Sequence, residues 1–194
     1  MNQNTRIKIY IAIAALLITT YLLKNSEPEN SLPVIGNIPD FEFVNSEGET
    51  INLTSLKGKV WVADFIFTTC NMACPIMTGN MNIIHKKYKQ NDDVRLVSIS
   101  VYPEYDTPEV LTKYASQYNA NTDRWYFLTG EESTVQEVIK DGFKIGDYED
   151  IIFHSEKFAL VDRSGMIRAY YNGMKTEDMK KLKKDINSLL KENS

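Results

Sequence analysis

The 194-residue sequence has only two cysteines and two histidines. Two cysteines are too few for a disulfide-rich scaffold, and too few for a structural zinc site closed by four sulfur ligands. A net charge of −4 argues against nucleic acid as a partner. The sequence also lacks internal repeats and low-complexity tracts. These absences leave one globular domain of about 150 residues with an appendage as the expected organisation.

A charge-free run, residues 9–23, follows a polar N-terminus, residues 1–8, that carries Arg6 and Lys8. As a helix this run would be about 22 Å long, shorter than a bilayer core of about 30 Å, although flanking tyrosines and lysines could extend its reach. It fits a transmembrane anchor or a signal peptide, and the lack of a small-x-small cleavage pattern favours the anchor. Basic residues before the run and acidic residues after it predict a cytoplasmic N-terminus at the cell membrane, with the globular domain outside the cytoplasm.

Residues 24–35 contain Pro28 and Pro33 and are expected to link the anchor to a domain of residues 36–194. Apolar alternation predicts a β-hairpin within residues 41–53. Alternating strands and helices follow, and the chain ends with a second hairpin and a helix. This order indicates an α/β protein with a thioredoxin-like fold and an N-terminal β-hairpin. A single N-terminal transmembrane helix is expected to precede this domain.

Residues 60–81 predict a buried strand, a sharp turn and a helix, and both cysteines, Cys70 and Cys74, lie at the turn. Pro75 suits the first turn of a helix. The free N–H groups and partial positive charge at a helix start stabilise thiolate, which is the nucleophile and the metal ligand. Two sulfur donors in one turn suit Cu(I), Zn(II) or reversible disulfide formation. A purely structural disulfide is disfavoured, because so short a loop removes only about 2 kcal/mol of chain entropy.

A third candidate residue is His154, which precedes the predicted terminal hairpin. In a thioredoxin-like fold the loop entering that hairpin lies next to the cysteine helix, so His154 could reach both sulfurs; by composition alone it would be an exposed loop residue. No proline follows Pro108, so the chain lacks the proline that touches the active disulfide in thioredoxins. Two thiolates and an imidazole suit copper, with sulfur favouring Cu(I) and nitrogen accommodating Cu(II). The other histidine, His85, is predicted to be a solvated helix residue.

Several other residues have both a structural and a functional interpretation. Met72 could add a thioether ligand for Cu(I), whereas Met77 and Met81, four residues apart, are typical of core packing. Asp64 lies in the apolar strand and needs a partner, so it either tunes the cysteines or is a satisfied core residue. Asp106, followed by a glutamate three residues later, has the spacing of a capping box and is predicted to open a helix. Similar spacing at residues 133 and 136 predicts another helix start, and a glycine at 142 predicts its stop.

Three stretches resemble the Sco (SenC) family: DFIFTTCNMACP, DTPEVLTKYA and HSEKFALVDRSGMIRAYYNG, which together cover most of residues 36–192. Members are membrane-anchored thioredoxin-fold proteins of cytochrome c oxidase assembly. The resemblance implies that Cys70, Cys74 and His154 bind copper, as Cu(I) or Cu(II). It also implies that the domain delivers copper to the dinuclear copper centre of an oxidase. Asn71 departs from the family pattern, because many members have proline there.

Two functions remain open. In a copper chaperone, reduced Cys70 and Cys74 with His154 hold one copper ion and pass it by ligand exchange to a copper-accepting oxidase subunit. This requires an extracytoplasmic thiol reductant, since a disulfide has no thiolate ligands. In a thiol–disulfide oxidoreductase, Cys70 attacks a disulfide of an extracytoplasmic partner and Cys74 resolves the intermediate. His154 and the absence of a late proline favour copper. A peroxiredoxin-type peroxidase is disfavoured, because Phe67 stands where threonine would be needed.

Overall fold

The computed structural model describes residues 3–24, 32–145 and 156–192. The chain divides into two compact units, residues 1–31 and 32–194. The first unit contains the helix α1 (Gln3–Lys24). Within the described residues, no helix is long and apolar enough to cross a membrane. The predicted transmembrane anchor at residues 9–23 therefore stays a prediction.

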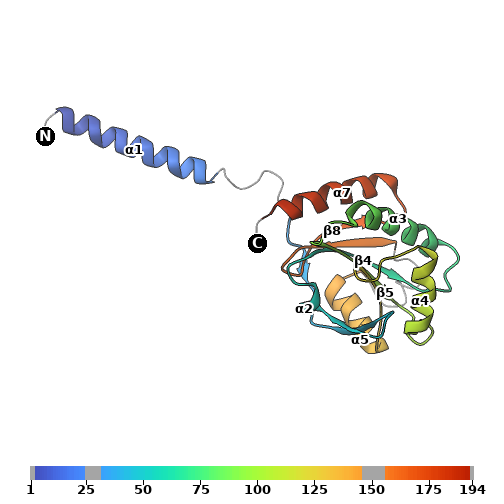
Figure 1. The fold of residues 1–194 in the computed structure, drawn as a ribbon. Coiled ribbons are helices and arrows are strands. Elements are labelled where there is room, and N and C mark those ends of the chain that lie inside the picture. Colours follow the sequence, from blue (N-terminus) through green and yellow to red (C-terminus); the bar gives the residue numbers. More distant parts are fainter. Residues whose placement is uncertain (1–2, 25–31, 146–155, 193–194) are drawn as a thin grey trace. The chain divides into compact units, whose positions relative to one another are not determined.

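The second unit is built on an eight-stranded mixed sheet with the order β1-β8-β7-β4-β5-β6-β2-β3 (Figure 1). The strands are β1 (Gly36–Asn37), β2 (Glu42–Asn45), β3 (Thr50–Asn52), β4 (Val60–Ile66), β5 (Val94–Ser100), β6 (Trp125–Thr129), β7 (Lys157–Val161) and β8 (Met166–Asn172). Strands β4, β5 and β6 are parallel, whereas β7 and the β2–β3 hairpin pair antiparallel on either side. The predicted N-terminal hairpin thus joins the main sheet through β6.

Helices cover both faces of this sheet. They are α2 (Leu53–Leu56), α3 (Ala73–Tyr88), α4 (Pro108–Gln117), α5 (Glu132–Glu137), the π-helix η1 (Val138–Phe143) and α7 (Thr176–Lys191). Helices α3, α4 and α7 pack on one core, and α2, α5 and η1 pack on the other. Figure 1 shows α3 and α7 side by side, and the Tyr88 hydroxyl of α3 donates to the Lys183 carbonyl of α7 at 3.0 Å.

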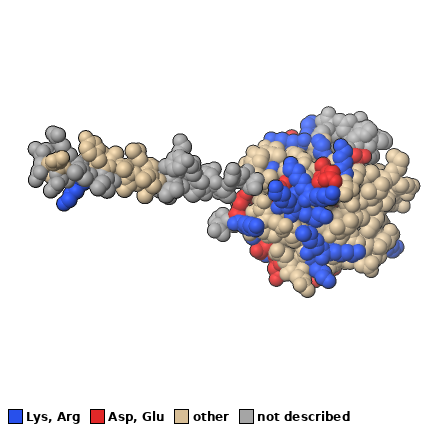
Figure 2. All heavy atoms as spheres, turned by 90° about the horizontal axis from the view of Figure 1, so that it is seen from above, with Lys and Arg blue, Asp and Glu red and all other residues tan. Residues whose placement is uncertain are grey.

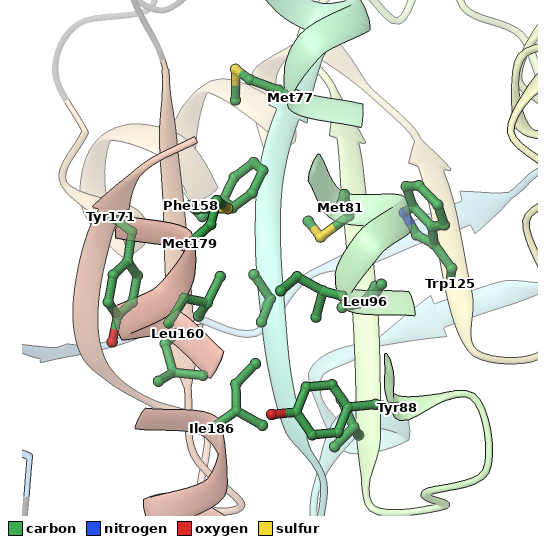
Figure 3. Packing of buried hydrophobic residues seen from close by; sticks show 14 of the residues in the cluster. Met77, Met81, Tyr88, Leu96, Trp125, Phe158, Leu160, Tyr171, Met179 and Ile186 are labelled. Atoms are coloured by element: carbon green, nitrogen blue, oxygen red, sulfur yellow. The ribbon is translucent and has the colours of Figure 1, made fainter. Parts of the chain in front are cut away.

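The central strand β4 is buried along its whole length, as its apolar run predicted, because helices cover it on both faces. Met77 and Met81 of α3 are also buried, as predicted. Figure 3 shows these methionines pointing into the core shared with Leu96 of β5, Phe158 of β7 and Ile186 of α7. The helix that follows the cysteines is therefore fixed to the sheet by its inner face.

The start of α4 differs from the capping-box prediction. The helix begins at Pro108, and Thr107 is its N-cap, with a hydroxyl that accepts from the Val110 N–H at 3.5 Å. Proline at the first helical position is pre-organised for a helix, so the Thr-Pro pair is sufficient as a start signal. Asp106, the predicted cap, is completely buried and has other hydrogen-bond partners.

The boundaries predicted for the next helix were also wrong. Glu131 is the N-cap of α5, so Ser133 lies inside the helix. Helical structure continues through Gly142, the predicted stop, as the π-helix η1, and the left-handed residue is Lys144 with φ 51°. Gly142 is needed for another reason, because a Cβ there would lie 2.7 Å from Cδ of Pro39.

Candidate copper and thiol site

The start of α3 brings Cys70 and Cys74 together. Strand β4 ends at Ile66, the chain turns, and α3 begins at Ala73, two residues before Pro75. Both cysteines are free thiols, and the backbone N–H of Cys74 donates to Sγ of Cys70 at 3.4 Å. The sulfur of Cys70 thus lies against the free N–H groups of the first helical turn, where a thiolate is stabilised.

The two thiols differ in exposure and acidity. Cys70 is partly exposed, whereas Cys74 is buried. Burial by itself would raise the pKa of Cys70, but backbone N–H groups, first that of Cys74, more than offset it, so this pKa lies below its usual value. Burial chiefly, with the neighbouring Cys70 sulfur and the charge of Asp64, raises the pKa of Cys74 to about 12. Cys70 is therefore the more acidic and the more accessible thiol of the pair, and Cys74 lies buried behind it.

A buried carboxylate holds the loop that precedes Cys70. Asp106 accepts from the Thr68 hydroxyl at 2.5 Å, from the Thr68 N–H at 3.2 Å and from the Ser100 hydroxyl at 2.6 Å. Thr68 is two residues before Cys70, so this carboxylate fixes the cysteine loop against the end of β5. Sequence reasoning missed this role. The signal was that Thr107 and Pro108 already make a complete helix start, which leaves the carboxylate of Asp106 free for another contact.

Asp64 lies on β4 beneath the cysteine helix and is fully buried. Its Oδ1 accepts from the Ser98 hydroxyl at 2.6 Å, and the Ser98 oxygen accepts from Nε1 of Trp125 at 2.9 Å. Its Oδ2 has no hydrogen-bond partner within the described residues. Burial raises the pKa of Asp64 to about 7, and its charge contributes to the high pKa of Cys74. Asp64 is thus a partly satisfied core residue that also acts electrostatically on the site.

His85 is buried, which corrects its prediction as a solvated residue. It is 9% exposed, and its ring packs on Trp125 with centroids 5.6 Å apart. The reason is that α3 turns this side of the helix toward the sheet, although Lys86 and Lys87 beside it are exposed. Burial lowers the pKa of His85. A neutral imidazole packed on an aromatic ring is a core residue.

The structure describes part of the predicted metal site. Cys70 and Cys74 meet, but His154, the predicted third ligand, lies outside the described residues. In the described parts of the chain, no group of three or more histidine, cysteine, aspartate or glutamate side chains could hold a metal ion. Met72 is 81% exposed. The predicted ligand set of two cysteines and a histidine therefore stays a prediction.

A pair of unequal cysteines at the start of a helix, on a mixed sheet covered on both faces, defines a thioredoxin-like protein for thiol or soft-metal chemistry. The chain belongs to the Sco family, because the SCO1/SenC family model matches residues 34–191. The prediction of a Sco protein is thereby confirmed.

Relatives and solved structures support this assignment. The SCO1 protein homolog of Bacillus subtilis (strain 168) is 37% identical over 187 residues, covering 93% of this chain and 97% of the relative. The structure of BsSco, described as a Sco protein of cytochrome c oxidase assembly with a disulfide switch, has a TM-score of 0.74 at 37% identity and covers 84% of this chain and 100% of that chain. Copper-bound ScoI of Bradyrhizobium japonicum has a TM-score of 0.60 at 27% identity, covering 76% and 98%. The similar structures confirm the predicted thioredoxin-like α/β fold.

Proposed function

We propose that this protein is a copper chaperone that binds one copper ion through Cys70, Cys74 and His154 and delivers it to the dinuclear copper centre of a cytochrome c oxidase. The observation that carries the proposal is the unequal thiol pair at the start of α3. Cys70 is exposed enough to meet an incoming ion and favours thiolate, and Cys74 lies one turn away. Relatives described with copper bound and in oxidase assembly support it.

Copper is the cargo of this site. Cys70 supplies the first thiolate, and Cys74 must lose its proton to become the second, so binding two sulfurs releases protons. Soft sulfur suits Cu(I), and an imidazole from His154 would accommodate Cu(II). Because Cys70 is partly exposed, an acceptor can replace the ligands one at a time, starting there. An extracytoplasmic reductant must keep both cysteines reduced.

We also propose that the protein is located at the cell membrane. The charge-free residues 9–23 and the charges around them are its support, and by the positive-inside rule they favour a globular domain outside the cytoplasm. Alkaline carbonate extraction of membranes, followed by protease treatment of intact spheroplasts, tests it. A chain that stays with the membrane and is digested from outside supports the anchor; release into the carbonate supernatant contradicts it.

A second candidate function is thiol–disulfide exchange, which the description of a disulfide switch in BsSco favours. The Cys70 thiolate would attack a partner's disulfide and form a mixed disulfide, releasing one partner thiolate. The Cys74 thiolate would then displace the second one, which leaves a Cys70–Cys74 disulfide and a partner reduced by two electrons. A thiol reductant would restore the pair. Both functions use the same cysteines, so cysteine variants alone do not separate them.

The histidine separates the two functions. The reduced full chain in detergent is titrated with Cu(II) without oxygen, and visible absorption and EPR are recorded. A one-to-one complex with thiolate-to-copper charge transfer that His154→Ala alters, and that His85→Gln as the matched control does not, supports the chaperone. An identical complex in His154→Ala removes His154 from the site. Rapid disulfide formation with release of Cu(I), unchanged by the variant, places thiol–disulfide exchange first.

A further inference from the structure

Exposed apolar side chains of the globular unit gather around the cysteine turn. Among the described residues of the second unit, seven large hydrophobic side chains are exposed: Val34, Ile35, Met72, Ile76, Ile83, Tyr102 and Tyr105. Met72 is the N-cap of α3, two of the seven lie on α3 itself, and two lie in the loop after β5, which the Asp106–Thr68 hydrogen bonds tie to the cysteine turn. Exposed apolar side chains grouped in this way mark an interaction surface.

Part of this group forms one line along α3. Ile76, Gly79 and Ile83 are spaced by three and four residues, so they lie on one face of the helix, and Met72 is the N-cap residue that precedes them; we call these four residues the α3 stripe. Met72 is 81% exposed, Ile76 51% and Ile83 55%. The opposite face of the same helix is fixed in the core by Met77 and Met81 (Figure 3). The stripe is therefore not needed for packing of the described domain.

Gly79 gives a second, independent sign of a docking surface. Glycine inside a helix is less stable than alanine because it costs more backbone entropy on folding. A Cβ at Gly79 would meet nothing within 4 Å, so no contact of the described structure requires glycine there. A glycine that the helix itself does not need leaves a shallow place in the stripe, between Ile76 and Ile83, where another chain can approach the helix backbone closely.

The charges around the stripe indicate what kind of partner fits it. The chain has a net charge of −4, yet α3 contains no acidic residue and ends with exposed Lys86 and Lys87. Exposed Lys181 and Lys184 of the neighbouring α7 continue the positive surface, whereas Lys180 pairs with Glu177. Figure 2 shows lysine and arginine side chains, with acidic ones among them, gathered on the face seen from above, where α3 and α7 lie. Charge complementarity therefore selects an acidic partner.

We propose that the α3 stripe is the docking surface for the copper-accepting protein, and that this protein presents an apolar strip flanked by acidic side chains. The inference rests on the proposed function, because its occupant is the acceptor of copper. From Ala73 to Lys87 the helical part of the surface is about 21 Å long, at 1.5 Å per residue, which suits one side of a small protein interface. A partner held on the stripe has its own ligands next to the partly exposed sulfur of Cys70. A lipid surface has no ligands to offer there, so the position of the thiol favours a protein.

The test is copper transfer from the full chain in detergent to the soluble copper-accepting domain of the oxidase subunit of the same organism. Ile76→Glu and Ile83→Glu should lower the second-order transfer rate at least tenfold, because each places an acidic charge against an acidic partner. Lys87→Glu should lower it and weaken its dependence on salt. Val34→Glu, which changes an exposed residue outside the stripe, should transfer at the wild-type rate. Copper affinity, measured by chelator competition, should be the same in all variants.

Gly79→Ala distinguishes docking from folding. The substitution should raise the thermal midpoint of unfolding, because alanine is the better helix former, and it should slow transfer severalfold because the added methyl fills the shallow place. Wild-type transfer rates in all stripe variants would overturn the docking surface and leave the proposed function standing. A wild-type protein that binds copper but transfers none to the acceptor would overturn the proposed function and this occupant together. Loss of binding to anionic vesicles in the same variants, with transfer unchanged, would assign the stripe to lipid and overturn the proposal.

Discussion

Two cysteines four residues apart have pKa values that are shifted in opposite directions in this protein. Cys70 receives the free N–H groups of a helix start, whereas Cys74 lies behind it in the core with Asp64 nearby. Two identical side chains therefore differ in how readily they form the thiolate. In the exchange reaction proposed above, the more acidic sulfur would make the first contact with a partner or an ion, and the less acidic sulfur would act after the first has reacted.

This asymmetry predicts selective alkylation. With iodoacetamide under reducing, metal-free conditions, Cys70 should be modified at a pH below the usual thiol range, because only the thiolate reacts and its pKa is lowered. Cys74 should remain unmodified up to pH 9, since its pKa is about 12. Peptide mass spectrometry over a pH series gives both rates. In guanidinium chloride the two rates should become equal; equal rates in the native protein would contradict the assignment.

Asp64 predicts a pH dependence of stability. Its pKa is about 7 in the folded chain and 3.8 when unperturbed, so the folded state holds the proton more tightly. Its contribution to stability is thus fully present below pH 3.8 and is lost as pH rises to 7, by about 1.4 kcal/mol for each pH unit. Asp64→Asn cannot ionise and keeps an acceptor for Ser98. The variant should gain stability relative to wild type between pH 5 and 7 and no further above it, as measured by urea unfolding. A difference independent of pH would show that Asp64 is ionised in the fold.

At the scale of elements, the loop between β4 and α3 depends on a contact from the loop that follows the neighbouring strand β5. Asp106→Asn keeps the size of the side chain but replaces one acceptor oxygen with a donor that faces the hydroxyl of Thr68 or Ser100. Buried groups left without a partner cost about 1–3 kcal/mol, and more when charge is involved. We expect urea unfolding to show a loss of about 2–3 kcal/mol. Asp123→Asn, at an exposed position, should stay within about 0.5 kcal/mol of wild type.

The same variant should also change the thiol. If Asp106 positions the cysteine loop through Thr68, its loss should raise the pKa of Cys70 toward the usual value, read from the pH dependence of iodoacetamide modification. A destabilised protein with an unchanged pKa of Cys70 would show that Asp106 is structural only. Rescue of both properties by Asp106→Glu is not expected, because Asp106 is fully buried and inserting a methylene into a packed interior costs stability.

The elements themselves follow from local sequence, and their exact ends do not. The apolar run of β4 and the Met77–Met81 spacing predict a buried strand and a core helix, since periodicity reports which side of an element is covered. The capping box at Asp106 was wrong because Thr107 and Pro108 satisfied the helix start first. His85 was wrong because its lysine neighbours describe only one side of α3. For His85, a contact distant in sequence, its packing on Trp125, decided between two locally acceptable arrangements.

At the scale of the whole molecule, the parts of the candidate site that are close in sequence could be predicted, and the parts that join distant segments could not. Cys70 and Cys74 lie within one turn, so their meeting follows from sequence alone. The Asp106 clamp joins two loops across the ends of β4 and β5, and its partner Thr68 is 38 residues away. The α3 stripe depends on knowing which side of a helix the core has already taken. These features are set by the topology of the sheet, which no local pattern specifies.

Arg168 on β8 is where three distant parts of the globular unit are joined. It is 8% exposed; its Nε donates to the Leu32 carbonyl at 2.9 Å, and its Nη1 donates to Asp162 at 2.8 Å and to Glu192 at 3.0 Å. These contacts connect the start of the unit, the β7–β8 turn and the residue after α7. A single guanidinium with five donors can hold all three together, which the ammonium of lysine cannot do with the same geometry.

The last prediction concerns this clamp. Arg168→Met retains the apolar stem and leaves Asp162 and Glu192 without their partner. Breaking a buried ion pair costs roughly 3–5 kcal/mol, and because Glu192 is partly exposed we expect about 2–3 kcal/mol in urea unfolding. Lys180→Met, which removes an exposed ion pair with Glu177, should cost less than about 0.5 kcal/mol. Hydrogen exchange should quicken at the Ile35 amide, which donates to the Ile167 carbonyl beside the clamp. Loss of stability with unchanged exchange at Ile35 would mean that Arg168 supports the strand turn and the chain end, and that the start of the unit is held by β1 alone.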